Sequence, residues 1–449
     1  MPAFATALFL LLEHSPWSYF VYVAFVLVFW RAVLHHRAVL RDALAPLYRS
    51  PSSRRRALLL LLWIVVSLEL VVVGYHRRWI FSVVFALLAL WPVVAASGGG
   101  VRHRALVLRW VASCLVLAVF PCLPTEYGDH TLLVELGGVV LALLLVISSI
   151  QTPASVAAPW LSQLRSLLLP LALSLATLHW TMSALAAKRK PALWLTLANW
   201  TLALLPIAWL AVRMRRWSAA LLTPRLRLAA VAAALAPPYI LLSISYEVLF
   251  YAALCAVLLC WVALEEEEAA EEQERETSSD ASAVRRAFFF LVLIKIAFFG
   301  TGNVASMSSF EISSTYRFVT VFSPFLMGAL LVVKILIPFL VVAVAFHALV
   351  VASSGRPNKD HRKKEAAVAS SSSPARYFLL VVAMSDLLAL QFLFLVRNEG
   401  SWKEIGNSIS MFGIVNAQIV FVPLLFLLAS ALAPKRVTTE EGAFKAKRV

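Results

Sequence analysis

Long apolar runs alternate with short polar links over almost the whole chain. The runs cover residues 17–34, 57–74, 79–96, 105–120, 131–150, 166–186, 194–212, 226–242, 246–264, 287–305, 325–351, 377–396 and 405–432. Most of them reach the roughly 17–25 residues that a helix needs to cross about 30 Å of hydrocarbon. Strand-type alternation of apolar and polar positions is absent. The pattern therefore predicts an all-α fold, a polytopic transmembrane helical bundle with about thirteen full spans.

A shorter apolar stretch, residues 4–12, comes before these runs and is followed by Glu13, His14 and Pro16. It has the length of a signal-peptide core but lacks a basic leading region and a small-residue cleavage site. We expect it to be an N-terminal half-span, the remainder of a helix whose first part is missing.

The polar links divide the chain into seven segments. Two of the links, one rich in Glu and one basic and then rich in Ser, have compositions that favour disorder. The expected segments are a truncated half-span with a lumenal link (1–16), a first block of transmembrane helices (17–264), an acidic cytosolic linker (265–286), core spans with a lumenal loop at 306–323 (287–351), a basic and Ser-rich cytosolic linker (352–376), the last two spans (377–432) and a cytosolic tail (433–449).

Composition agrees with a membrane protein. Hydrophobic residues occupy 61% and charged residues 14% of the 449 positions, whereas soluble domains are about half apolar and a quarter charged. The net charge of +16 gathers at the ends of apolar runs, where basic residues set membrane topology. We therefore expect no nucleic acid among the partners. The four cysteines form no metal-ligand or CxxC pattern.

The basic residues also predict an orientation. The links after residues 34, 96, 212, 351 and 432 carry most of the Arg and Lys and fall on one side, which the positive-inside rule makes cytosolic. Two basic links, at 77–78 and 188–190, disagree. The balance places the N-terminal end of the module on the lumenal side and the C-terminus in the cytosol. There, Lys445 and Lys447 match the dilysine retrieval signal of endoplasmic-reticulum membrane proteins, so we expect a multi-pass protein of that membrane.

No HExxH, GxSxG or Walker pattern occurs, so the sequence assigns no catalytic residue and no metal ligand. The polar groups of interest are charges inside apolar runs, above all Lys295, Lys334 and Asp386. Such charges are costly in lipid and face a bundle interior or a polar cleft. They either pair to fix helix packing or contact a lipid headgroup, and the two lysines suit a phosphorylated lipid. The Gly300-Thr301-Gly302-Asn303 sequence favours a helix end with a tight turn over a phosphate-binding loop.

Several stretches together resemble the membrane part of the GPI ethanolamine phosphate transferases, in particular the type that acts on the first mannose of the GPI precursor. They lie at residues 15–22, 245–250, 285–289, 297–306, 320–331, 334–338 and 400–402, with 285–339 the most specific region. The resemblance implies that a lumenal domain of the alkaline-phosphatase type, with its zinc ions and nucleophile, is missing from this chain. We therefore expect no cofactor in the chain and no activity of the chain by itself, whether it is a fragment, an isoform or a truncated gene product.

The resemblance also implies a task for the helices. Phosphoethanolamine would pass from phosphatidylethanolamine to the GPI precursor, and both lipids are held in the membrane. A bundle that presents both headgroups to one active site supplies positioning. We expect a lumenal rim for this purpose, built by Tyr246, Glu247, Gly300, Thr301, Gly302, Asn303, Glu311 and Tyr316.

Two other functions stay open. The chain could be a non-catalytic scaffold that binds other proteins of the GPI pathway. The intramembrane charges would also permit a lipid or solute transporter, although the internal repeat common in transporters is not evident.

Overall fold

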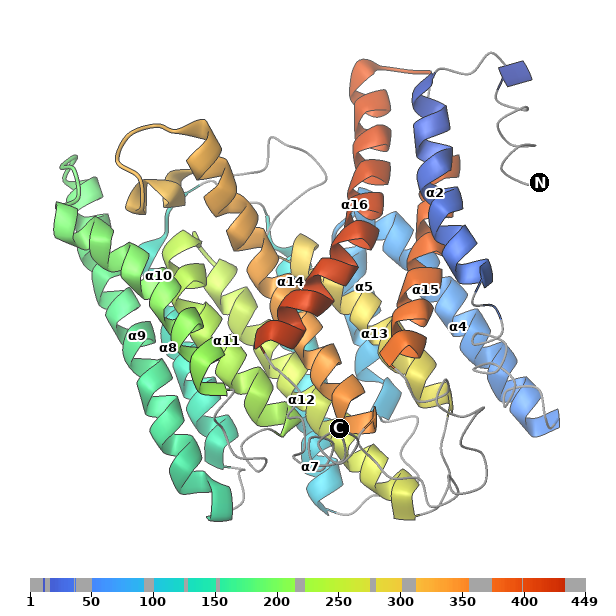
Figure 1. Ribbon diagram of the computed structural model, residues 1–449, viewed down its shortest axis with the longest axis horizontal. Helices are drawn as coiled ribbons and strands as arrows, with labels where there is room; N and C mark the ends of the chain where they lie inside the picture. The colour runs from blue at the N-terminus through green and yellow to red at the C-terminus, as the bar shows by residue number, and fades with distance from the viewer. Residues whose placement is uncertain are drawn as a thin grey trace, which may run out of the picture.

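A computed structural model describes residues 11–12, 17–35, 37, 51–92, 101–124, 128–150, 154–214, 223–274, 280–300, 312–354, 374–397 and 399–432. Within these ranges the chain is helical and contains no strand, which confirms the expected all-α class (Figure 1). The elements are α2 (Trp17–His35), α4 (Pro51–His76), α5 (Ile80–Ala89), α7 (Val101–Val119), η2 (Phe120–Cys122), α8 (Thr131–Ile150), α9 (Ala154–Ala186), α10 (Leu193–Met214), α11 (Pro224–Leu242), α12 (Glu247–Glu274), α13 (Asp280–Phe299), η5 (Ser313–Arg317), α14 (Pro324–Ser354), α15 (Pro374–Phe394) and α16 (Trp402–Leu432).

Eight of the described helices are long and apolar enough to cross a membrane, namely α7, α8, α9, α10, α11, α12, α14 and α16. A helix satisfies all its backbone polar groups internally, which is what a lipid environment demands of an apolar segment. The chain is therefore a multi-pass membrane protein, as expected. The count of about thirteen spans is not reached by this measure, because α5 and the described apolar parts of α4 and α15 are shorter.

The centre of the bundle is formed by α11 and α12. In their membrane windows 94% and 83% of the residues are buried, against 28–33% for α7, α8, α9 and α10. Figure 1 shows α11 and α12 between α8, α9 and α10 on one side and α14 on the other, with α2 and α4 at the far edge. The Ala-rich sequence of α11 explains this place, since small side chains allow helices to approach closely in membranes.

Gly137 allows a close approach of two helices at this centre. A Cβ atom on Gly137 of α8 would lie 2.7 Å from the backbone nitrogen of Leu249 on α12. Because the obstacle is backbone, a side chain at this position would push the two helices apart.

The acidic linker differs from the expectation. Residues 265–274 continue α12, and the side chain of Glu265 is buried between the guanidinium groups of Arg285 and Arg286. The acidic run is thus partly a packed helix end, because basic residues at the start of α13 neutralise it. Residues 1–10 of the expected half-span, 355–373 of the basic linker and the tail from 433 onward lie outside the described residues.

Candidate functional site

Four links between helices lie at one end of the bundle (Figure 1). Their described residues are 120–124 with 128–130, 187–192, 243–246 and 312–323, and we call this the Ser243 end. The Tyr246 hydroxyl donates to the Pro124 carbonyl at 2.7 Å, and the Arg78 guanidinium reaches the Phe120 carbonyl at 3.5 Å. These contacts join links that are far apart in the sequence.

Arg317, the last residue of η5, binds the C-terminal end of α11. Its Nη1 donates to the carbonyls of Ile240 at 3.5 Å, Leu241 at 3.1 Å and Ser243 at 2.8 Å, and its Nη2 pairs with Asp129 at 2.7 Å. The last carbonyls of a helix have no partner within the helix and carry partial negative charge. A fully buried guanidinium therefore satisfies them and holds η5 against the break between α11 and α12.

The environment of Arg317 acts on its charge in two opposing ways. Burial lowers the pKa of the guanidinium, and the Asp129 carboxylate opposes that shift. An arginine keeps its proton in proteins, so a buried ion pair stands at this end of the bundle.

Helix α10 holds the same segment from the other side. The Asn199 amide donates to the Arg317 carbonyl at 3.0 Å, and the Trp200 indole donates to the Phe318 carbonyl at 3.1 Å. Asp129, Asn199 and Arg317 were not among the site residues expected from the sequence. The one feature of the sequence that could have indicated these contacts was an asparagine inside an apolar run, because a buried amide needs a hydrogen-bond partner.

Glu247 and Lys334, two of the expected site residues, pair with each other. The Lys334 ammonium lies 2.8 Å from a Glu247 carboxylate oxygen, and both side chains are nearly buried. Glu247 opens α12 and also accepts a hydrogen bond from the Ile244 backbone N–H at 2.7 Å. A carboxylate at a helix N-terminus is favourable for this reason. The charge of Lys334 is therefore balanced inside the protein.

The expected rim residues that the structure describes are enclosed or partly enclosed. Tyr246 and Glu247 are buried, and Tyr316 is half-buried within η5. A Cβ atom on Gly300 would lie 2.0 Å from the ring of Phe250, so this glycine allows a close approach to α12. Thr301, Gly302, Asn303 and Glu311 lie outside the described residues, as do Lys445 and Lys447.

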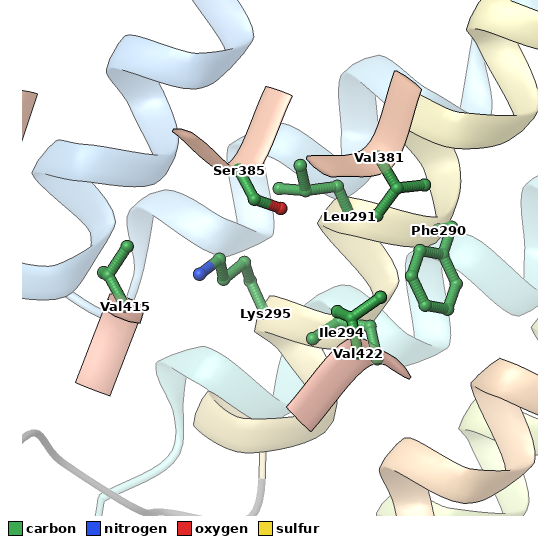
Figure 2. A pocket seen from close by; sticks show the side chains of 8 residues that line it. All are labelled: Phe290, Leu291, Ile294, Lys295, Val381, Ser385, Val415 and Val422. Carbon is green, nitrogen blue, oxygen red and sulfur yellow. The ribbon is translucent and has the colours of Figure 1, made fainter. Parts of the chain in front are cut away.

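Lys295 lies in a different place, between α4, α13 and α15. Its ammonium lies 3.0 Å from the Tyr75 hydroxyl and 5.4 Å from the centre of the Tyr75 ring. That ring contacts Phe299 and Phe392, each at 4.7 Å between centroids. Lys295 also lines a pocket between α13, α15 and α16 (Figure 2).

Asp386 does not join either lysine. It is fully buried on α15, and neither carboxylate oxygen has a hydrogen-bond partner in the described part of the chain. The structure thus separates three charges that the sequence grouped together: Lys334 in an ion pair, Lys295 at a pocket and Asp386 by itself.

A second charge cluster lies at the opposite end of the bundle. Arg285 and Arg286 both pair with Glu265, at 2.9 and 2.7 Å, and Arg285 also pairs with Glu268. The Arg285 guanidinium stacks 4.4 Å from the centre of the Trp91 ring, which is the geometry of a cation–π contact. This cluster ties α12 to α13 and was not anticipated from the sequence.

The residues that the structure describes contain no cluster of metal-ligating side chains. Among them, no three His, Cys, Asp or Glu side chains come close enough together to hold a metal ion.

Comparison with known proteins gives a consistent match. The family profile described as Phosphatidylinositolglycan class N (PIG-N) matches residues 1–401. Proteins named GPI ethanolamine phosphate transferase 1 are each 32% identical to the chain in Yarrowia lipolytica, Mus musculus and Homo sapiens, over 94%, 96% and 96% of the chain. The chain spans 44%, 46% and 46% of those three proteins. No solved structure matches the chain.

Proposed function

Because the chain belongs to the phosphatidylinositolglycan class N (PIG-N) family, we propose that it acts in GPI-anchor biosynthesis as the membrane module of a GPI ethanolamine phosphate transferase. The reaction would move phosphoethanolamine from phosphatidylethanolamine to the first mannose of the GPI precursor. The observation that carries this proposal is the match to relatives named for that transferase over at least 94% of the chain.

The module would present the two lipids to the reacting groups. Both substrates are held in the bilayer, so fixing their headgroups relative to each other lowers the entropic part of the barrier. The Ser243 end suits this role, because Arg317 and the Glu247–Lys334 pair hold its links in one arrangement. Four of the expected rim residues would position the rim from inside the bundle; they are Tyr246, Glu247, Gly300 and Tyr316.

The rest of the expected rim, Thr301, Gly302, Asn303 and Glu311, belongs to the same proposal. The catalytic groups and the zinc ions would come from a part of the relatives that this chain does not cover. Proteins of the GPI pathway are the proposed partners of the exposed links.

The module would lie in the endoplasmic-reticulum membrane with the Ser243 end facing the lumen. Five further helices, α2, α4, α5, α13 and α15, would complete the thirteen spans. The Ser243 end is then opposite the helix ends at Val101, Met214 and Ser354, next to which the basic stretches 102–104, 213–227 and 359–376 stand in the sequence, in agreement with the positive-inside rule. The C-terminus, with Lys445 and Lys447, would be cytosolic.

Depletion of the protein in its source organism tests this function. GPI precursors would be extracted and their mannose substituents read by mass spectrometry. We expect precursors without phosphoethanolamine on the first mannose to rise about tenfold, and re-expression of the gene to reverse the change. An unaltered precursor profile in depleted cells, with the protein shown to be absent, would exclude the proposal and leave the scaffold and transporter functions.

A further inference from the structure

Arg227 is a buried cation without an acceptor in the described part of the chain. It stands in the first turn of α11 and is 8% exposed, and its guanidinium makes no hydrogen bond or ion pair with a described residue. Arg286 and Arg317 are also deeply buried, but each is held by a carboxylate. A guanidinium keeps its proton in proteins, and a buried charge needs a partner. The contrast indicates that an anion completes the surroundings of Arg227.

A second donor without an acceptor lies beside Arg227. His347 belongs to α14, which packs against α11. Its Nδ1 atom is buried and has no hydrogen-bond partner among the described residues, and the charge of Arg227 acts on its ring. An imidazole carries at least one N–H group. A guanidinium and an imidazole therefore lie together, and the described residues supply an acceptor to neither.

The first turn of α11 adds positive potential at the same place. Backbone N–H groups at a helix N-terminus lack partners within the helix and carry partial positive charge, which favours anions. Thr223, the N-cap residue, makes no side-chain cap hydrogen bond. The Arg227 side chain tilts toward this terminus, because Cβ atoms in a helix point that way. Thr223 is exposed, and Pro224 and His347 are partly exposed, so this place opens on the surface of the bundle.

The depth of Arg227 agrees with the level of lipid phosphates. Arg227 stands three residues after Pro224, the start of α11, which is about 4.5 Å along the helix axis. Since α11 ends at Leu242, next to Ser243, its start lies at the opposite end of the bundle. Both α11 and α14 are long enough to cross the membrane, and lipid phosphates lie just outside the hydrocarbon core. In the proposed orientation this end faces the cytosol, where the leaflet carries anionic lipids.

We propose that the surface between the first turn of α11 and α14 binds the phosphate group of an anionic glycerophospholipid, with Arg227 and His347 donating to the phosphate oxygens. The planar guanidinium of an arginine matches the oxygens of a phosphate and binds two of them at once. The acyl chains lie along the lipid-facing side of the bundle. A free phosphate ion offers the same oxygens without the chains, so the test separates the two ligands. The site lies at the end opposite the rim and does not depend on the transferase function.

Lipid binding by the purified full chain in detergent tests the proposal. Phosphatidylglycerol with a fluorescent acyl chain is titrated, and diacylglycerol of the same chains and inorganic phosphate are the competitors. We expect diacylglycerol to bind about tenfold more weakly, because the charge-assisted hydrogen bonds to the phosphate are lost. Inorganic phosphate at millimolar concentration should not displace the lipid, because it lacks the chains. Equal affinity for diacylglycerol would overturn the proposal, and full displacement by inorganic phosphate would assign a free anion and overturn the lipid.

The variant Arg227→Met addresses the site itself and should weaken phosphatidylglycerol binding about tenfold. The matched control is Arg213→Met. Arg213 stands in the last turn of α10, at the same end of the bundle, and is exposed beside the Trp209 ring. The control variant should keep the wild-type affinity. Equal losses in the two variants would reduce the effect to general attraction by a basic surface and refute the site.

Stability without lipid gives a second readout. In lipid-free detergent, Arg227→Met should unfold at the wild-type temperature or above it, because the change removes a buried charge that no described residue pairs. A lower midpoint would show that another part of the chain supplies the anion, and would overturn the proposal.

His347→Leu is the second variant and leaves Arg227 in place. It should also weaken phosphatidylglycerol binding about tenfold, and it decides alone if Arg227→Met cannot be purified. Wild-type affinity in the folded site variants would refute the site. The precursor profile of depleted cells, which tests the transferase, is unaffected by either outcome.

Discussion

Gly300 shows how a contact between residues far apart in the sequence restricts which residue can occupy one position. The sequence favoured a helix end with a turn at this position, and α13 does end at Phe299 with Gly300 in a turn. The backbone does not require a glycine there, because Gly400 is the one described glycine with a positive φ. What Gly300 meets is the ring of Phe250, which is fully buried and lies 5.6 Å from the Phe120 ring. Because that ring is packed in the core, the absence of a side chain at residue 300 is what permits the contact.

We therefore predict that Gly300→Ala lowers the stability of the folded chain by about 1–3 kcal/mol, the usual cost of overpacking. The midpoint of thermal unfolding in detergent measures this. Gly328→Ala is the control, because a Cβ at Gly328 meets nothing within 4 Å and α14 gains a better helix former. Equal midpoints for the two variants would show that Phe250 can yield.

At the level of elements, the short helix η5 is held by groups outside itself. Five residues cannot form a stable helix in isolation, because nucleation is unfavourable. Arg317 compensates by binding the end of α11 and Asp129, and α10 holds the Arg317 and Phe318 carbonyls. The break between α11 and α12 and the position of η5 thus depend on each other.

Arg317→Met should release η5 from the helix ends. The change removes one partner of a buried ion pair, which typically costs about 3–5 kcal/mol. Hydrogen exchange at the backbone amides of residues 315–319 is expected to rise more than tenfold. The control is Arg397→Met, whose exposed pair with Glu404 at 3.7 Å contributes little. Unchanged hydrogen exchange in the Arg317 variant would mean that the hydrogen bonds from α10 are sufficient to hold η5 in place.

At the scale of the whole molecule, the bundle has two chemically different ends. The Ser243 end is joined by hydrogen bonds to backbone carbonyls, whereas the opposite end is joined by Glu265 and Arg285 with Trp91. The two ends would face different compartments in the proposed orientation. The basic residues at 188–190 lie at the Ser243 end, so the charge distribution by itself leaves a conflict.

Glycosylation mapping resolves this orientation. An acceptor sequon inserted in the link 187–192 should be glycosylated in cells, because that link lies at the proposed lumenal end. The same insertion in the link 352–376 should stay unmodified. A gel shift removed by a glycosidase reports the result, and the reverse pattern would invert the orientation of the module.

The sequence by itself determined the all-α class, the membrane setting and the approximate ends of the helices. These follow from local properties, since an apolar run of sufficient length must form a helix to satisfy its backbone in lipid. It also identified Lys295, Lys334 and Asp386 as unusual, because the cost of a charge in an apolar run is visible without a partner.

The tertiary structure alone decided what each of these charges does. Pairing of Lys334 with Glu247, of Arg317 with Asp129 and of Arg285 with Glu265 joins residues up to 188 positions apart. Small residues, hydrogen bonds and shape determine which helices pack together in a membrane. Apolar residues cover the lipid-facing and the protein-facing sides of such helices almost equally. No local periodicity therefore encodes which helices become neighbours. For that reason the pocket at Lys295 became visible only when α13, α15 and α16 were placed together.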